Sequence, residues 1–268
     1  GIVQGMFRNF WNFNVELVYF PETLNNRLTR GGPMALSLAG TNASFMLATD
    51  SRKSFVLEGF GGFERIPGDM DGWNANVAVR LKPSDNISLS VGPQCMVLSN
   101  ETQWIGRFVD PVKTSTYGSR YVFGHIDQKV VSAEVRLNWT FTPQLSLQAY
   151  LQPFIAVGAY DRFKELDRPR AYAYNTFGEN GSTFVQAGGR ATVDPDGEGP
   201  AAPFSFGNPD FNMKSLRGTV VLRWEYRPGS LFYFVWTQNR AAYTNPGTLR
   251  LQRDLADLFT APGDNIFM

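Results

Sequence analysis

The sequence is poor in the side chains that most often carry redox, metal or electrostatic functions. Its 268 residues include one cysteine, Cys95, and one histidine, His125. One cysteine forms no disulfide within the chain, and one histidine cannot supply a histidine-based metal site. The 25 basic residues nearly balance the 24 acidic ones, and a net charge of +1 indicates no nucleic-acid partner. We therefore predict no cofactor, no metal ion and no nucleic acid.

Long hydrophobic runs are also missing. No stretch approaches the roughly 18 to 20 apolar residues of a spanning helix, which excludes a helical membrane protein. The sequence has no internal repeat of fixed period and no signal peptide. Because it begins abruptly at Gly1, we expect the C-terminal part of a longer protein, with residues 1–268 forming a single domain.

What the sequence does have is period-two alternation of polar and apolar residues. It is cleanest in residues 132–142, where every second residue is apolar. These apolar residues are Ala133, Val135, Leu137, Trp139 and Phe141. The alternation resumes in residues 145–152, after a Thr-Pro-Gln turn. Such a pattern predicts two strands joined as an antiparallel hairpin with one apolar and one polar face.

Two further hairpins show the same pattern. Residues 73–81 lead through a Pro-Ser-Asp-Asn turn to residues 87–91, and residues 216–226 lead through Pro228 and Gly229 to residues 231–238. Weaker alternation predicts further strands at residues 11–19, 41–49, 54–63, 94–99, 103–109 and 121–126. We expect roughly 10 to 12 strands, or more, in the chain.

The segments between these strands are either short turns or long loops. The long loops are residues 22–33, 111–119 and about 160–211, and they are rich in Gly, Pro, Asn and Asp. Within the last loop, residues 183–188 and 190–193 predict a small extra hairpin. Short turns on one side and long loops on the other are typical of outer-membrane barrels. The predicted fold is therefore all-β, an antiparallel transmembrane β-barrel of outer-membrane type.

A soluble β-sandwich or barrel is the alternative, because it alternates in the same way. Two features favour the membrane. The polar faces carry opposed charges that suit a wet lumen, as in Glu134 with Arg136 and Arg223 with Glu225. Aromatic residues such as Trp73 lie near strand ends, where interface girdles form. We expect the bacterial outer membrane as the location, with its lipid and lipopolysaccharide as partners.

Several motifs resemble one outer-membrane family. They include residues 120–128 (RYVFGHIDQ), 136–148 (RLNWTFTPQLSLQ), 163–166 (FKEL) and 222–230 (LRWEYRPGS). In order and spacing they resemble the C-terminal barrel of the family known as domain of unknown function 5916, whose members look like a family-nine carbohydrate-binding module fused to a barrel. The resemblance covers most of the chain. It implies a barrel of unassigned activity and supplies no catalytic residues.

The chain departs from that family pattern at both ends. The carbohydrate-binding-like module that the resemblance implies is absent from residues 1–268, so its sugar binding is not expected of this chain. At the other end the sequence stops at Met268, where the family continues through a last strand that ends in an aromatic residue. We therefore expect the barrel to lack its closing strand.

The predicted polar faces carry arginines and glutamates that would face the lumen. The lumen-facing candidates are Arg80, Arg107, Glu134, Arg136, Arg217, Arg223 and Glu225, together with Glu16 and Glu58. Rings of charged side chains select ions in pores. We expect a pore, or a membrane anchor for a partner protein or fused periplasmic module, linked to the binding or uptake of a glycan ligand.

A carbohydrate-active outer-membrane enzyme, or a structural barrel in a surface complex, is the alternative. His125 with Asp127 and Ser119 would suit a hydrolase, but no serine stands in a nucleophile context, which favours a polar role at a strand end. The carboxylates Asp161, Glu165 and Asp167 would suit glycoside hydrolysis only if two of them converge in a cleft. The sequence favours a non-enzymatic role and predicts no catalytic residue.

The long loop offers two more candidates. Three of its carboxylates would suit calcium, but their spacing is not that of a full calcium loop, so a solvated surface is favoured. They are Asp194, Asp196 and Glu198. Three aromatic residues would either stack on sugar rings or pack the loop itself, and packing is favoured. They are Tyr172, Tyr174 and Phe177.

Overall fold

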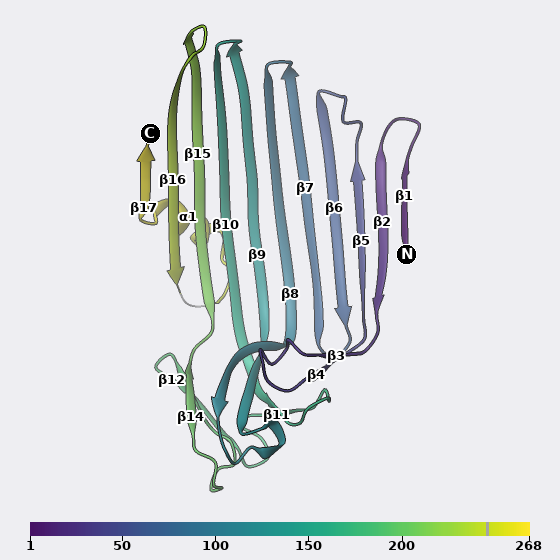
Figure 1. Cartoon of the computed structure of the whole chain (residues 1–268), viewed down its shortest axis with the longest axis vertical. Helices are drawn as coiled ribbons and strands as arrows, with labels where there is room; N and C mark the ends of the chain where they lie inside the picture. The colour runs from purple at the N-terminus through teal and green to yellow at the C-terminus, as the bar shows by residue number, and fades with distance from the viewer. Residues whose placement is uncertain (245–246) are drawn as a thin grey trace.

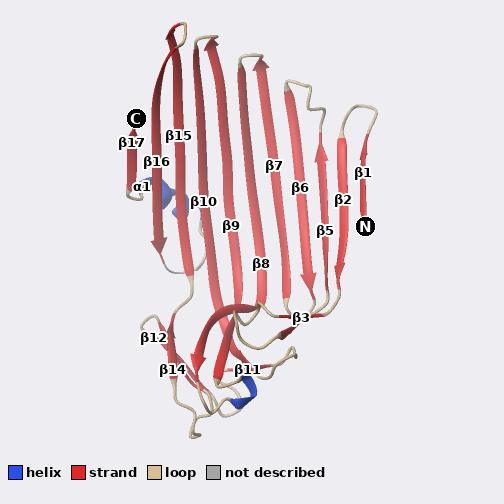
Figure 2. Cartoon of the chain, in the orientation of Figure 1, coloured by secondary structure: helices blue, strands red, loops and turns tan. Residues whose placement is uncertain are grey.

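The computed structural model describes residues 1–244 and 247–268, and its regular structure is almost entirely antiparallel β (Figure 2). The main sheet has 12 strands, which confirms the all-β antiparallel prediction. Its strands are β1 (Ile2–Met6), β2 (Asn12–Phe20), β5 (Gly40–Ala48), β6 (Phe55–Ile66), β7 (Met70–Ser84), β8 (Ile87–Val109), β9 (Ser119–Thr142), β10 (Leu145–Leu166), β11 (Tyr174–Thr176), β15 (Phe211–Arg227), β16 (Ser230–Thr244) and β17 (Gly263–Phe267).

Two small sheets and two helices complete the regular structure of the described residues. The first small sheet pairs β3 (Thr23–Asn25) with β4 (Ala35–Ser37). The second contains β12 (Thr183–Ala187), β13 (Arg190–Asp194) and β14 (Phe204–Gly207). The helices are the 3-10 turn η1 (Thr114–Thr116) and α1 (Leu251–Thr260). In the described ranges, no helix has the length and apolar content needed to cross a membrane.

The main sheet is a meander in which nearly every strand pairs with its neighbour in sequence. The order is β1-β2-β5-β6-β7-β8-β9-β10-β15-β16-β17, with β11 added to the end of β10. Tight turns join the strands at one end of the sheet, and β1 and β17 lie at its two lateral margins (Figure 1). No pairing joins β1 to β17 within the described residues, so the sheet is open.

The strong hairpins lie where the alternation predicts them, but several strands are longer than expected. The segments 94–99 and 103–109 belong to one strand, β8, and residues 121–126 belong to β9. The expected loop of residues 160–211 is wrong at its start, because β10 continues to Leu166. The register with β9 shifts along β8 between Asn100 and Gln103, and along β10 between Asp161 and Lys164. Each shift moves the following side chains to the other face, which explains why the alternation in the sequence breaks there. The expected small hairpin is confirmed as β12–β13.

The far ends of β8, β9 and β10 leave the sheet and form a separate packed unit. We call this unit, residues 22–38, 100–126 and 160–207, the head (lower part of Figure 1). Two clusters of buried residues pack on opposite sides of β9, because consecutive strand residues point to opposite faces. One contains Val122, Phe163, Phe177, Ala191, Val193 and Phe206, and the other contains Ala35, Tyr121, Phe123 and Leu166. The sheet of β12–β14 covers the first side, and the β3–β4 segment covers the second.

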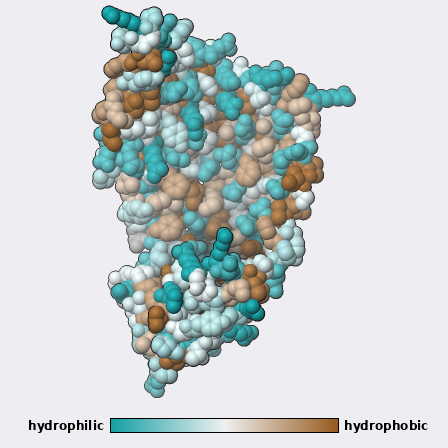
Figure 3. Space-filling view, viewed as in Figure 1, coloured by the Kyte–Doolittle hydropathy of each residue, from teal (hydrophilic) through white to brown (hydrophobic). Residues whose placement is uncertain are grey.

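The main sheet has two chemically different faces. Antiparallel register partners lie on the same face, so each row across the strands can be read directly. One row of the apolar face is Phe55, Leu81, Leu89, Leu137, Ala149 and Val220. The adjacent row, on the polar face, is Arg80, Ser90, Arg136, Tyr150, Thr219 and Thr237. In the view of Figure 3 the deepest hydrophobic patches lie at the two lateral margins of the sheet, with hydrophilic and pale residues between them.

Large side chains of the apolar face are exposed rather than buried. Trp73 is 45% exposed and Trp224 is 49% exposed, although both belong to the interior of a paired sheet. One part of this face is covered by the chain itself. There Lys214 is fully buried beneath α1, and its ammonium group donates to Asp257 at 3.0 Å and lies 3.4 Å from Asp254. A buried cation in an otherwise apolar face is tolerated because α1 supplies its counter-charges.

Candidate functional site

Three arginine–glutamate pairs lie on the polar face. Arg80 lies 3.7 Å from Glu58 across β6 and β7, and Arg223 lies 3.8 Å from Glu225 along β15. Arg136 donates to Glu134 two residues away on β9. The side chains are between 29% and 57% exposed, so water and salt screen these pairs and each contributes little to stability. The pairs therefore serve mainly to place charged groups of both signs on the polar face.

The remaining predicted lumen residues divide between sheet and head. Arg217 lies on the polar face, where its register partners are Gln152 and Asn239. Arg107 instead lies in the head, where it pairs with Tyr121 and donates to Ser119 Oγ at 3.1 Å. The expectation that Arg107 shares a surface with the other arginines is therefore not met, because β8 passes two irregularities before it reaches that position.

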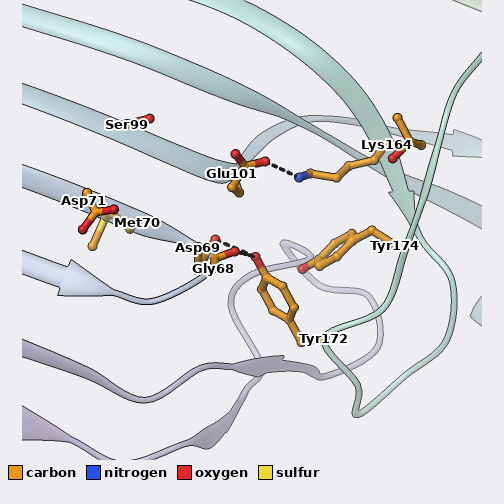
Figure 4. A pocket seen from close by; sticks show the side chains of 10 residues that line it. Gly68, Asp69, Met70, Asp71, Ser99, Glu101, Lys164, Tyr172 and Tyr174 are labelled. Carbon is orange, nitrogen blue, oxygen red and sulfur yellow. Dashed lines mark hydrogen bonds and ion pairs between the residues drawn. The ribbon is translucent and has the colours of Figure 1, made fainter.

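A cavity of about 440 Å³ lies where the sheet meets the head. We call it the rim cavity. Its walls come from the β6–β7 turn, the irregular part of β8, the end of β10 and the segment leading into β11 (Figure 4). It is lined by Gly68, Asp69, Met70, Asp71, Ser99, Glu101, Lys164, Tyr172, Tyr174 and Thr176. Gly68 has φ +84°, a conformation suited to glycine, and this turn brings Asp69 into the cavity.

Hydrogen bonds across the rim cavity tie the head to the sheet. Tyr172 Oη donates to the Gly68 carbonyl at 2.8 Å and lies 3.2 Å from Asp69 Oδ1 (Figure 4). Within the head, Lys164 donates to Glu101 at 2.8 Å, and Arg162 donates to the other oxygen of Glu101 at 2.6 Å. The cavity therefore has fixed polar walls.

The ionisation of these groups follows from their surroundings. Burial, reinforced by the nearby Asp69 carboxylate, raises the pKa of the Tyr172 and Tyr174 phenols well above their usual range. Burial opposes ionisation of Glu101, but the hydrogen bonds from Lys164 and Arg162 outweigh it and lower the pKa of Glu101. At neutral pH the cavity thus presents two phenol groups beside a paired carboxylate. The Tyr174 hydroxyl is buried and has no hydrogen-bond partner within the described residues.

A buried ionic cluster fixes the connection between β8 and β9. Arg120 donates to Asp110 at 2.6 Å and to both oxygens of Glu165 at 2.8 Å, and Lys113 donates to Glu165 at 2.9 Å. Burial disfavours the Arg120 charge, but the hydrogen bonds that Arg120 donates to Glu165 and Asp110 outweigh it and raise the pKa of Arg120. The carboxylate of Glu165 is thus already bound by the cationic side chains of Arg120 and Lys113. Removing one partner of such a buried cluster strongly destabilises the fold, so the role of the cluster is structural.

The structure changes the partners expected for His125. Ser119 Oγ instead accepts a hydrogen bond from Arg107. Asp127 Oδ1 lies 3.5 Å from His125 Nε2. Closer to the ring are Ser99 on β8, which the sequence did not single out, and Asp161 on β10, which it offered only for glycoside hydrolysis. Their proximity depends on the register of three strands, and only correct strand pairing would have revealed it.

The other sequence candidates mostly have structural roles. Asp194 and Asp196 accept hydrogen bonds from the backbone amides of Gly197 and Ala201, as expected of a surface loop. Among the described residues, no group of three or more His, Cys, Asp or Glu side chains is placed to hold a metal ion. Phe177 is 8% exposed within the core of the head, where it packs rather than presents its ring to a ligand.

The carboxylates proposed for glycoside hydrolysis do not form a free pair. Asp161 contacts His125, and Glu165 lies in the Arg120 cluster. Asp167 accepts a hydrogen bond from Asn175. The carboxylates that do share a cavity are Asp69, Asp71 and Glu101. Sequence spacing gave no sign of them, because they come from a turn, from the start of β7 and from an irregular part of β8.

Comparison with known proteins gives one match. The model of a family described as domain of unknown function (DUF5916) matches residues 2–268. No curated protein and no solved structure matches the chain.

Proposed function

The chain belongs to the DUF5916 family, and from that premise we propose that it forms the wall of a bacterial outer-membrane β-barrel that acts as a pore. The observation that carries the proposal is the contrast between the two faces of the main sheet. The apolar face exposes large aromatic residues such as Trp73 and Trp224, and the polar face carries arginine–glutamate pairs such as Arg80 with Glu58. A sheet that is polar on one face and apolar on the other suits water inside and lipid outside.

The dimensions of the apolar face support the proposal. On β9 it runs from Val131 to Phe141, a length similar to the roughly 9 to 11 residues of a membrane-crossing strand. Tight turns lie at one end, and the head lies at the other (Figure 1). An open sheet edge would leave backbone groups unpaired in lipid, so closure of the barrel by additional strands is part of this proposal.

Single-channel conductance of the full-length protein in planar bilayers tests the pore. We expect steps of current, and we expect the double variant R80E/R136E to shift the channel toward cations because charged side chains on the lumen wall select ions. The matched control is R107E, whose side chain lies in the head and is expected to leave selectivity unchanged. Flat traces at every voltage would contradict the pore and leave a membrane anchor.

We also propose that the rim cavity holds a glycan, which links the barrel to glycan binding or uptake. The specific support is the Tyr174 hydroxyl, a buried group without a partner, beside Tyr172 and the Asp69 and Glu101 carboxylates. A sugar offers hydroxyl groups for such polar atoms and an apolar ring face for tyrosine. Calorimetric titration with neutral oligosaccharides is expected to show binding that Tyr174→Phe weakens about fivefold, the effect of one hydrogen bond. Equal affinity in both proteins would contradict the assignment.

A further inference from the structure

A serine, a histidine and a carboxylate from three adjacent strands lie in line at the border between sheet and head. Ser99 Oγ lies 2.8 Å from His125 Nε2, and His125 Nδ1 lies 2.5 Å from Asp161 Oδ1. Ser99 pairs in register with Asp127, and His125 pairs with Asp161, so these side chains share one face. His125 is 5% exposed, whereas Ser99 lines the rim cavity. The imidazole is thus hydrogen-bonded at both ring nitrogens, and the Ser99 hydroxyl is accessible from the rim cavity.

The hydrogen bonds determine which imidazole nitrogen carries the proton. An ionised carboxylate only accepts hydrogen bonds, so the contact with Asp161 requires a proton on Nδ1. In the tautomer with a proton on Nδ1 alone, Nε2 accepts a hydrogen bond from Ser99 Oγ at 2.8 Å, with Asp127 Oδ1 3.5 Å from the same nitrogen. A histidine oriented in this way by a carboxylate acts as the general base for a serine nucleophile.

The position of these residues suggests the kind of substrate. The last mainly apolar row of the sheet contains the register partners Phe63, Trp73 and Val97, and it reaches Lys129 on β9. The next row toward the head, on the same face, contains Arg65, Asp71 and Ser99. A change from aromatic to charged residues marks the boundary between hydrocarbon and headgroups. Ser99 therefore lies at the depth where the ester groups of a membrane lipid would be found.

We propose that Ser99, His125 and Asp161 form a catalytic site that hydrolyses carboxylic esters, and that the substrate is an acyl ester of a membrane lipid. The choice of a lipid rests on the proposed membrane function, whereas the ester chemistry does not. Asp161 is a positioning residue, because it acts through the imidazole of His125.

The reaction proceeds in two balanced steps. Ser99 Oγ attacks the ester carbonyl carbon while its proton moves to His125 Nε2. The C–O bond to the alcohol then breaks, and the alcohol leaves with that proton, which gives an acyl-serine. Water attacks the acyl-serine in the same way, gives up one proton to His125 Nε2, and releases the fatty acid as Ser99 regains its hydrogen. No oxidant, reductant or cofactor takes part.

The negative charge that develops on the carbonyl oxygen needs a nearby cation or hydrogen-bond donor. Lys129 is exposed and lies on the same face, with Val97 as its register partner. It is therefore diagonal to Ser99, at a Cβ distance of roughly 7 to 8 Å for such pairs. A lysine side chain is long enough to reach a carbonyl held above Ser99, so we assign Lys129 to this role.

Covalent labelling tests the nucleophile without depending on the substrate. The full-length protein in detergent is treated with a fluorophosphonate probe, and the modified peptide is identified by mass spectrometry. We expect the label on Ser99, with loss of labelling in Ser99→Ala and His125→Gln. The matched control, Ser88→Ala, removes a serine from the same strand but from the opposite face, and is expected to label normally. Far-UV circular dichroism identifies any variant that fails to fold.

Hydrolysis of a diacyl phospholipid in mixed micelles tests the substrate class. We expect Ser99→Ala to lower kcat by about 10⁴-fold and Asp161→Asn to lower kcat with an unchanged KM, because the positioning residue acts on chemistry rather than on binding. Absence of both label and ester hydrolysis in the folded wild-type protein would overturn the site. Hydrolysis of water-soluble short-chain or acetylated-sugar esters alone would overturn the lipid substrate. Failure of the pore in bilayers leaves the labelling result unaffected, so the two proposals are tested separately.

Discussion

Strands β8, β9 and β10 run through both the sheet and the head, and their surroundings differ between the two regions. In the sheet part of β9, Trp139 is 37% exposed, and Phe141 is 41% exposed. In the head part of the same strand, Val122 and Phe123 are both fully buried. The head covers its apolar residues with β3–β4 and β12–β14, whereas the described residues leave most of the apolar face of the sheet uncovered. Alternation thus defines an apolar face, but it does not determine whether the protein itself covers that face.

The largest effect is expected where the head buries its core. Phe123→Ala removes a fully buried ring that contacts Trp104 and Tyr174, and should destabilise the head by about 3 to 5 kcal/mol. Hydrogen exchange should show faster opening in β9 residues of the head and little change in the turn-end half of the same strand. Equal loss of protection along all of β9 would contradict two separately covered regions.

A smaller effect is expected on the apolar face of the sheet, and only in lipid. Leu137→Lys places a charge on that face and should cost about 2 to 4 kcal/mol in a bilayer. Its matched control is Asn138→Lys on the polar face, the next residue of β9, which should be nearly neutral. Urea unfolding in liposomes measures both variants. If the two lysines cost the same, the assignment of lipid to the apolar face is wrong.

The smallest effect is a pH dependence confined to the head. The hydrogen bonds from Lys164 and Arg162 hold the pKa of Glu101 below its ordinary value of 4.5. The stability that Glu101 contributes is therefore present above that value, and it is lost as the pH falls through the lower pKa of the folded state. We expect the free energy of unfolding of the head to fall by about 1 kcal/mol over this acid range. The stability of the Glu101→Gln variant should not fall over this acid range. If the variant loses stability with acid as the wild type does, Glu101 is not the source of the pH dependence.

Much of the fold was predictable from sequence, because antiparallel hairpins are local. The alternation of residues 132–152 predicted β9 and β10, and the turn at Pro228 and Gly229 predicted the β15–β16 hairpin. The head was predicted in part: residues 103–109 and 121–126 and the β12–β13 hairpin are strands as expected, but β10 continues into the expected loop through irregular pairing that shifts the side-chain period. Sequence also gave no sign that Lys214 would be buried, because its partners on α1 lie about 40 residues further along.

The candidate sites were less predictable than the strands. His125 attracted attention as the single histidine, but its partners Ser99 and Asp161 lie on neighbouring strands. The rings of Tyr172 and Tyr174 make them sugar-stacking candidates in the sequence, whereas nothing in the sequence around Asp69 and Glu101 indicates that they share a cavity. Sites assembled from several strands depend on register, and register is set by pairing across the whole sheet rather than by local spacing.

The neighbour-to-neighbour pairing of the main sheet has a consequence for the order of folding. From β5 to β10 each hairpin brings together residues that are close in sequence, so little loop entropy is lost at each step and the strands can add one by one. The pairing of β10 with β15 instead closes a long segment, and that segment contains β12–β14. Early formation of this small sheet would shorten the loop and speed its closure. Pulse-labelling hydrogen exchange should then find β12–β14 protected before β15.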